Sequence, residues 1–289
     1  MRVFVTGAGG MLAQSTVRAL EAARHDVLTL GRDDADVTRF DALIHPIRTF
    51  RPDWVFHLAA FTKVDECESR PDHAYLVNGL GARNVALAAG ECAAAVLSIS
   101  TDYVFAGDAK RPYREYDPAA PKSVYGASKW AGEQAVREVN PRHLIVRTSW
   151  LFGRGGPNFI DTILARARNG ESLRVVDDQR GSPTWTHDLA RGLIDLVGTG
   201  QYGTYHCTNS GDCTWYDLAA HVLERAGVRA PLERTDSASF ARPAPRPAYS
   251  VLDPHWFDHV TGRPMPRWDD AVDRYLESTH AAGTARRET

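Results

Sequence analysis

Residues 2–13 read RVFVTGAGGMLA, and this stretch decides the fold. Arg2 to Thr6 has the β-branched and apolar character of a short buried strand. The strand runs into a glycine-rich turn, which opens a segment of helical spacing from Met11 to Ala23. This order is typical of a phosphate site, because a bare backbone lets a diphosphate approach the N–H groups at the positive end of the helix dipole.

The glycine-rich turn contains the residues that we expect to hold the phosphates of a dinucleotide. Gly7 would make the tight turn, and Gly10 would allow the close approach of the diphosphate. Met11 and Leu12 follow in the first turn of the helix. Ala13 stands where a third glycine is common, and the dinucleotide fingerprint tolerates alanine there. A glycine cluster that forms only a loop is the alternative for this turn taken alone.

Downstream, short apolar runs alternate with segments of helical spacing, which is the pattern of a parallel sheet covered on both faces. The sequence therefore predicts an α/β fold with a doubly wound parallel sheet (Rossmann) and a second, smaller substrate-binding domain. We place the dinucleotide-binding domain at 1–150 with a returning segment near 186–210, the interleaved second domain at 151–280, and a frayed tail at 281–289. The predicted strands are Arg2–Thr6, Asp26–Leu30, Trp54–Leu58, Ala95–Ser100 and His143–Thr148, and the predicted helices are Met11–Ala23, Phe40–Phe50, His73–Gly90 and Ser123–Val139.

Composition and charge narrow the function classes. The chain of 289 residues has 34 Lys and Arg against 36 Asp and Glu, so its formal net charge of -2 attracts neither nucleic acid nor anionic lipid. Apolar runs such as 93–97 are far shorter than the ~18 residues of a membrane-spanning helix. Glycines follow the first strand too soon for a secretory signal, so we expect a cytoplasmic protein. The cysteine spacing predicts reduced thiols, and the histidine spacing predicts no metal site.

The residues after the second predicted strand bear on the choice of cofactor. Gly31-Arg32-Asp33-Asp34 lies about 20 residues beyond the glycine turn, where recognition of the ribose is expected. Arg32 would pair with the 2′-phosphate of NADP, whereas Asp33 or Asp34 would accept a hydrogen bond from the free 2′-hydroxyl of NAD. Solvated loop charges are the alternative for all three residues. This segment therefore leaves both cofactors open.

Tyr125 and Lys129 are four residues apart, so on a helix their side chains share a face. An ammonium beside a phenol favours the phenolate, which makes the phenol a better proton donor to a developing alkoxide. We therefore expect Lys129 to lower the pKa of Tyr125. Taken alone, the spacing more often marks a surface pair.

Thr101 lies in the stretch SISTDYVF, Ser98 to Phe105, at the carboxyl end of the fourth predicted strand. Doubly wound sheets place their ligands at that end. A hydroxyl donor aimed at a ketone oxygen beside Tyr125 would stabilise the negative charge that develops there. We expect Thr101 in that role, and a strand-end turn satisfied by serine and aspartate is the alternative.

Together, these three signals in this order resemble the extended form of the short-chain dehydrogenase/reductase superfamily. Within it, the chain is similar to the dTDP-4-dehydrorhamnose reductase family, and the similarity runs over most of the chain. The stretches that carry it are LAAFTKVD (58–65), Val77-Asn78, STDYVF (100–105), Val124-Tyr125-Gly126 with Lys129, RTSW (147–150), DQRGSPT (178–184), and Arg246-Pro247 with Ser250.

The resemblance also implies which residues bind and react. The implied catalytic residues are Thr101, Tyr125 and Lys129. The implied substrate-binding residues are Thr62, Val64, Thr101, Trp150, Gln179 and Arg246. Beyond the glycine turn and Arg32, the implied cofactor-binding residues are Asp36, Val37, Leu58, Ala59, Ala60, Thr62, Tyr125 and Lys129. Some relatives bind magnesium through a glutamate of the first helix, where this chain has Gln14 and Ser15, so no metal is carried over.

The activity that the resemblance implies is NAD(P)H-dependent reduction of the C4 ketone of dTDP-4-dehydro-L-rhamnose to dTDP-L-rhamnose. NADPH is the favoured cofactor and NADH the second. One alternative is a reductase or epimerase of another nucleotide-linked 6-deoxy sugar. Another is a non-catalytic NADP-binding subunit that regulates a partner enzyme. The nucleotide sugar is the expected partner, neither nucleic acid nor a membrane is expected, and a homodimer is the one assembly considered.

Overall fold

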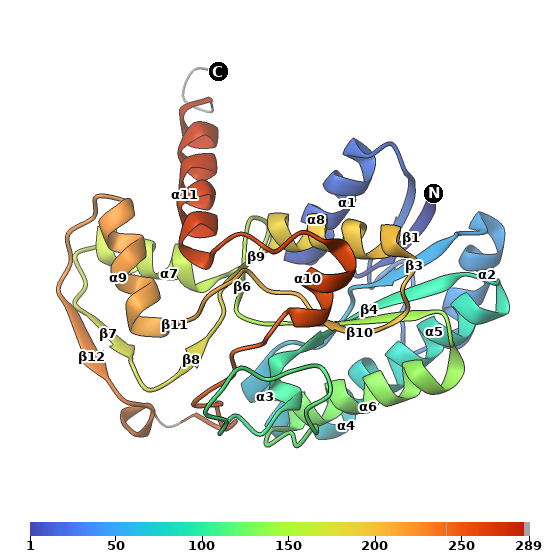
Figure 1. The fold of residues 1–289 in the computed structure, drawn as a ribbon, viewed down its shortest axis with the longest axis horizontal. Coiled ribbons are helices and arrows are strands. Elements are labelled where there is room, and N and C mark those ends of the chain that lie inside the picture. The colour runs from blue at the N-terminus through green and yellow to red at the C-terminus, as the bar shows by residue number, and fades with distance from the viewer. Residues whose placement is uncertain (241, 286–289) are drawn as a thin grey trace.

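A six-stranded parallel sheet forms the centre of the computed structural model, which describes residues 1–240 and 242–285. Its strand order is β10-β5-β4-β3-β1-β2 (Figure 1). The inner strands are buried on both faces, which explains why they are continuous apolar runs in the sequence. The strands are β1 (Arg2–Thr6), β2 (Asp26–Leu30), β3 (Trp54–His57), β4 (Ala95–Thr101), β5 (His143–Thr148) and β10 (Gly203–His206).

Helices cover both faces of this sheet, which confirms the predicted doubly wound α/β fold (Figure 1). Val3 and Val5 of β1 pack toward one face and Phe4 toward the other, as the two-residue period of a strand requires. The face of Val3 is covered by α1 (Met11–Ala22), α8 (Thr186–Thr199) and α10 (His255–Thr261). The face of Phe4 is covered by α2 (Phe40–Phe50), α5 (Gly81–Glu91) and α6 (Val124–Val139).

The helix predicted over His73–Gly90 is divided into three pieces. After the short α3 (Val64–Ser69), α4 (Pro71–Ala74) passes into a π-helical turn, η1 (Tyr75–Leu80), and then into α5. The wider turn brings Asn78 into the interior, where its side chain is buried. A π-helical turn takes up an extra residue without any change in composition, so hydrophobic spacing does not reveal it.

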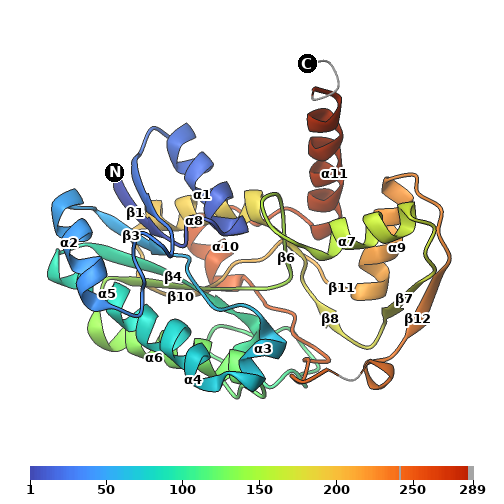
Figure 2. The same cartoon turned by 180° about the vertical axis from the view of Figure 1, so that it is seen from behind.

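The second unit is a smaller layer of helices and short strand pairs beside the carboxyl ends of the central strands (Figure 2). Its core is formed by buried residues such as Phe152, Ile160, Leu173, Val222 and Tyr275. Its helices are α7 (Phe159–Arg168), α9 (Trp215–Arg225) and α11 (Trp268–Ala285), with η3 (Ser237–Ser239). Its strand pairs are β6 (Leu151–Phe152) with β9 (Thr184–Trp185), β7 (Leu173–Val176) with β12 (Leu232–Thr235), and β8 (Arg180–Gly181) with β11 (Cys213–Thr214).

The chain passes between the two units several times. It returns to the sheet through α8 and β10, within the segment near 186–210 that the sequence analysis assigned to such a return. It returns again through α10 and the segment that follows this helix, where Phe257 and Met265 join the core under α8, so residues within the predicted 151–280 domain belong to the first unit. At the end, α11 continues through Ala285, past the predicted start of the tail at Ala281, because alanines extend a helix readily. Residues 286–289 lie outside the described part of the chain.

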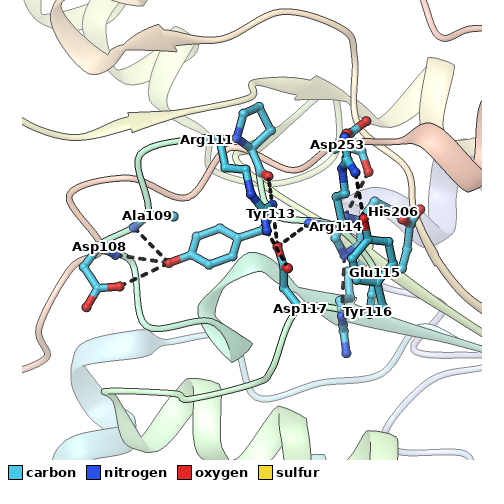
Figure 3. Close-up of polar contacts among 12 residues, drawn as sticks. Asp108, Ala109, Arg111, Tyr113, Arg114, Glu115, Tyr116, Asp117, His206 and Asp253 are labelled. Carbon is cyan, nitrogen blue, oxygen red and sulfur yellow. Dashed lines mark hydrogen bonds and ion pairs between the residues drawn. The ribbon is translucent and has the colours of Figure 1, made fainter.

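A loop that follows β4 and the 3-10 turn η2 (Asp102–Val104) is held together by one tyrosine. The hydroxyl oxygen of Tyr113 accepts hydrogen bonds from the backbone N–H groups of Gly107, Asp108 and Ala109 at 2.9, 3.1 and 3.2 Å. Figure 3 shows the last two of these bonds and the paired contact between Arg111 and Asp117. The loop in turn supports the segment around Pro247, because a β-carbon on Gly107 would lie 2.4 Å from the Pro247 side chain.

Within the described residues, no helix has both the length and the apolar character that crossing a bilayer requires. Nor do three or more histidine, cysteine or carboxylate side chains in these residues gather as a metal site would need.

Candidate active site

A cavity of about 1180 Å³ opens along the carboxyl ends of the central strands and continues into the second unit. Ligands of doubly wound folds bind at this end of the sheet. From the first unit it is lined by residues that include Gly10, Met11, Leu12, His57, Leu58, Ala59, Ala60, Thr62, Val64, Thr101, Asp102, Tyr103, Tyr125 and Lys129. From the second unit it is lined by residues that include Trp150, Phe159, Arg166, Arg174, Gln179, Trp215, Phe240 and Arg246.

The turn between β1 and α1 has the form that a diphosphate requires. Gly7 has a φ of +78°, and a β-carbon there would lie 2.6 Å from the backbone nitrogen of Ala59, so only glycine fits. Gly10 is the N-cap residue that precedes α1, and no side chain of the described residues caps that helix end. The first N–H groups of α1 are therefore open to the cavity, which Met11 and Leu12 line.

The loop after β3 forms the wall next to this turn, and Asn78 holds it in place. The Asn78 side chain accepts a hydrogen bond from the Phe61 N–H at 2.8 Å and donates one to the Phe61 carbonyl at 3.1 Å. It also donates to the Ser128 hydroxyl of α6 at 3.0 Å. The π-helical turn thus fixes the loop that carries Thr62 and Val64 against the helix that carries Tyr125.

Thr101, Tyr125 and Lys129 come together on one wall of the cavity. Thr101 is the last residue of β4, and Tyr125 lies in the first turn of α6. The helix approaches the 3-10 turn that follows β4 closely because residue 126 is glycine, where a β-carbon would lie 2.1 Å from the Tyr103 carbonyl. The Lys129 ammonium donates to the Ile99 carbonyl at 2.7 Å, which anchors it beside the end of β4.

The electrostatics of this wall differ in one respect from the expectation. Burial raises the pKa of Tyr125, and a hydrogen bond with Thr101 only partly opposes this rise. Burial therefore outweighs any lowering by Lys129, whose ammonium points to the Ile99 carbonyl, and the net change of the Tyr125 pKa is upward rather than downward as predicted. Burial also lowers the pKa of Lys129 to about 8, although the Glu133 charge opposes this change. Glu133 is bonded twice to Arg147, at 2.9 and 2.8 Å, which weakens its effect on Lys129.

His57 is a cavity residue that sequence reasoning missed. It is the last residue of β3 and is almost fully buried, with Nδ1 3.0 Å from the Thr6 hydroxyl. Burial and the nearby Lys129 charge lower its pKa to about 3, so the imidazole is neutral. Its place at a strand end was the only signal available in the sequence, where the histidine spacing bears only on a metal site.

Trp150 enters the cavity from an unusual backbone position. Its φ of +47° lies in the left-handed region, which a tryptophan occupies only when its surroundings enforce it. The indole stacks on Trp215 with ring centres 3.6 Å apart, and a β-carbon on Gly181 would lie 2.4 Å from it. The Trp215 N–H donates to the Gln179 side-chain oxygen at 3.2 Å, and Gln179 donates to the Ser237 hydroxyl at 2.8 Å. Trp150 and Gln179, two of the predicted substrate-binding residues, thus belong to one ordered wall of the cavity.

Arg246 reaches the cavity from the proline-rich segment, and an ion pair sets its direction. Its guanidinium donates to Asp65 at 2.9 Å and to the Ala244 carbonyl at 3.0 Å. Arg242 contacts the same carboxylate at 3.5 Å but is largely exposed. Sequence reasoning did not anticipate Asp65, because it lies on α3, far from Arg246 in the chain.

The remaining predicted cofactor residues lie outside this cavity. Arg32 lines a second cavity of about 380 Å³, together with Ala60, Phe61, Thr62, Lys63, Glu66, Arg70 and His73. Asp34 accepts a hydrogen bond from the Gly31 N–H at 2.8 Å, so its carboxylate already has a structural partner. Asp36 accepts two bonds from Thr38, and Val37 is buried in the core beneath α5. The structure therefore gathers most of the predicted site, but it leaves Asp36 and Val37 apart from both cavities.

The comparisons with known proteins agree over nearly the whole chain. The family model described as "RmlD substrate binding domain" matches residues 1–281. The chain is 44% identical to a dTDP-4-dehydrorhamnose reductase of Streptomyces griseus, over 94% of this chain and 91% of the relative. It is 38% identical to a dTDP-4-keto-6-deoxy-D-glucose reductase of Streptomyces niveus, over 94% of this chain and 95% of the relative.

The crystal structure of dTDP-4-dehydrorhamnose reductase from Bacillus anthracis in complex with NADP is also similar. It has 37% identity and a TM-score of 0.93, with 96% of this chain and 99% of that chain covered.

Proposed function

The chain belongs to the family described as the RmlD substrate binding domain, and on this basis we propose that it reduces the C4 ketone of dTDP-4-dehydro-L-rhamnose to dTDP-L-rhamnose with NADPH. One observation supports this proposal more than any other. Thr101, Tyr125 and Lys129 share a wall of a cavity that also reaches the uncapped N-terminus of α1 and the stacked pair of Trp150 and Trp215. A reducing cofactor and a sugar could thus meet at the phenol.

The first unit fits a dinucleotide. The glycine turn would receive the diphosphate on the N–H groups of α1, and Leu58, Ala59 and Ala60 would line the adjoining nucleotide. NADPH, when bound, supplies the hydride. Lys129 would hold the ribose hydroxyls, and Arg32 would pair with the 2′-phosphate. NADH, which lacks that phosphate, would bind the same site with fewer contacts.

Tyr125 would donate the proton to the ketone oxygen. Burial keeps this phenol protonated, so its proton is available when negative charge develops on the ketone oxygen. Thr101 donates a second hydrogen bond to that oxygen, and the Lys129 ammonium stabilises the phenolate that remains. These three roles come from two elements, β4 and α6, and Gly126 permits the close contact of α6 with η2, the turn that follows β4.

The substrate would occupy the part of the cavity that enters the second unit. Thr62 and Val64 line the sugar position, and Trp150 presents an aromatic face to it. Arg246 offers N–H donors to the diphosphate, and its ion pair with Asp65 holds the side chain in the cavity wall. Gln179 is held by Trp215 and Ser237 and would contact the nucleotide part.

A second candidate keeps the chemistry and changes the sugar. The relative from Streptomyces niveus is named for dTDP-4-keto-6-deoxy-D-glucose, and its similarity also extends over nearly the whole chain. The catalytic wall would serve either sugar, because both carry the ketone at C4. An epimerase would use the same residues but would recycle its cofactor without net consumption.

The location and assembly of the enzyme are further parts of the proposal. Cys67, Cys92, Cys207 and Cys213 are free thiols, which suits a reducing compartment such as the cytoplasm. A homodimer stays a prediction, which light scattering coupled to size-exclusion chromatography tests.

The experiment that tests the function is NADPH oxidation by the purified protein, with dTDP-4-dehydro-L-rhamnose generated in the cuvette. Rapid loss of NADPH with dTDP-L-rhamnose as product supports the proposal. The Tyr125→Phe variant should lose most turnover while still binding NADPH. Faster turnover of dTDP-4-keto-6-deoxy-D-glucose would favour the second candidate. An absence of turnover on both sugars, with NADPH still bound, would instead favour a regulatory subunit.

A further inference from the structure

The hydroxyl of Thr101 has a partner that competes with the proposed reaction. Thr101 donates a hydrogen bond to Asp102 Oδ1 at 3.0 Å, and its oxygen accepts one from the Tyr103 N–H at 3.3 Å. A threonine hydroxyl has one proton and two acceptor positions. While that proton is bonded to Asp102, Thr101 cannot also donate it to a ketone oxygen.

Asp102 is a buried acid with an incomplete set of partners. Its side chain is almost fully buried beside the cavity, and its Oδ2 atom has no hydrogen-bond partner among the described residues. A charged carboxylate in this position is costly, because one of its oxygens receives no hydrogen bond. The neutral acid is less costly, and it has an O–H group that can donate.

We propose that Asp102 is a positioning residue that sets the direction of the Thr101 hydroxyl, which rests on the function proposed above. In the neutral form, the Asp102 O–H donates to Thr101 Oγ1. Together with the Tyr103 N–H it then fills both acceptor positions of that oxygen, and the Thr101 proton is free for the ketone. In the charged form, Asp102 takes the Thr101 proton as a hydrogen-bond acceptor, and the polarising donor is lost.

The groups around Asp102 suit a change of charge near neutral pH. Burial raises the pKa of Asp102 to about 6, although the nearby hydroxyls of Ser250 and Thr101 favour its charged form. Tyr103 of the same turn and Tyr125 of α6 face it; burial raises the pKa of both phenols, and the negative charge of Asp102 adds to that rise.

The cations that line the same cavity include Lys129 and Arg246, which could act on this charge. Lys129 lies one helical turn beyond Tyr125 on α6, and Arg246 lies on the segment that carries Ser250. Arg246 is already paired with Asp65, and Lys129 is bonded to the Ile99 carbonyl. Both cations thus have partners of their own, and burial remains the largest influence on the Asp102 pKa.

The pH dependence of kcat/KM tests the proposal with the sugar that the enzyme reduces. In the wild type, kcat/KM should fall about tenfold for each pH unit above the Asp102 pKa, before any second fall due to Lys129 near pH 8. In Asp102→Asn the amide N–H donates permanently to Thr101, so the first fall should vanish and the second should remain. The second fall is an internal control for an intact site.

Two other results in Asp102→Asn would overturn the proposal. One is a profile with the first fall unchanged. The other is low activity at every pH despite normal thermal unfolding and NADPH binding, which would mean that the charged carboxylate is needed. Ser250→Ala is the matched variant. It removes a nearby hydroxyl that favours the charged form of Asp102, so the first fall should move to higher pH.

A measurement without turnover separates this proposal from the proposed function. Carbon-13 NMR of the aspartate carboxyl groups, assigned with Asp102→Asn, gives the Asp102 pKa directly. Thr101→Val removes the hydroxyl that bonds to both forms of Asp102, and because the bond to the charged form is the stronger one, the Asp102 pKa should rise. An unchanged pKa in Thr101→Val would overturn the proposed coupling even if the wild type reduces the sugar. A rise would support the coupling even if the sugar proves to be a different one.

Discussion

Arg274 of α11 holds Asp188 of α8 with two parallel hydrogen bonds of 2.9 and 2.7 Å, and this pair ties the second unit to the helix layer over the sheet. Asp188 is almost fully buried and also accepts a bond from Asn209 at 2.8 Å, so its carboxylate depends on partners from several parts of the chain. Removing one partner of a buried pair leaves an uncompensated charge.

Arg274→Leu should therefore lower the free energy of unfolding by about 3 kcal/mol. Urea denaturation measures this change. Arg225→Leu is the matched control, because Arg225 pairs with Asp273 on the surface, where such pairs contribute about 0–1 kcal/mol. If both variants lost the same small amount, the Arg274 pair would not tie the units together.

Tyr113→Phe should destabilise the loop after β4. The change leaves the three N–H groups of 107–109 without their acceptor, at a cost of about 2 kcal/mol. Because this loop supports the segment of Pro247 and Arg246, we also expect a higher KM for the nucleotide sugar. Steady-state kinetics and thermal unfolding measure the two effects. Tyr116→Phe is the control, since Tyr116 is largely exposed, and an equal effect there would contradict the interpretation.

The charge of Lys129 should control activity in the alkaline range. Its pKa is lowered to about 8, so the ammonium is present below that pH and is lost as the pH rises through it. Because the cation stabilises the phenolate of Tyr125, kcat/KM should fall above about pH 8. Lys129→Met should be poorly active at all pH values and show no such fall. A wild-type profile that stayed flat up to pH 10 would argue against this role.

The second cavity should determine the preference for NADPH. Arg32, Lys63 and Arg70 bring three cations to a pocket with one carboxylate, Glu66. Arg32→Ala should weaken NADPH binding about tenfold and NADH binding little, since one charge-assisted hydrogen bond to the 2′-phosphate is lost. Fluorescence titration with both cofactors measures this. Arg39→Ala, an exposed change on the neighbouring segment, serves as control. Equal losses for both cofactors would mean that Arg32 does not contact the phosphate.

Local structure could be predicted best from the sequence where a pattern is compatible with only one kind of structure. The strand, glycine turn and helix at 2–13 could form little else, and the i,i+4 spacing placed Tyr125 and Lys129 on one face of α6. Patterns were insufficient where the partner is distant in the chain. The bond between Arg246 and Asp65 forms only when the second unit meets the first, and the stacking of Trp150 on Trp215 forms only when distant segments of the second unit pack together.

Other features had no signal at all in the sequence. The π-helical turn around Asn78 has the composition of an ordinary helix, and the far wall of the cavity comes from α7 and β7, which carry no motif. The direction of the Thr101 hydroxyl also depends on atoms whose burial only the folded chain determines.

The repeated passage of the chain between its two units also limits how specificity can change. β10 completes the central sheet and α10 completes its covering layer, yet both are encoded after the first segments of the second unit. The part that contacts the sugar is therefore not one continuous segment of the chain that can be exchanged for the corresponding segment of a relative. Any such transplant would remove a strand and a helix from the recipient's own core. A change of specificity from one sugar to another must instead be made by substitution of single side chains along the wall of the cavity.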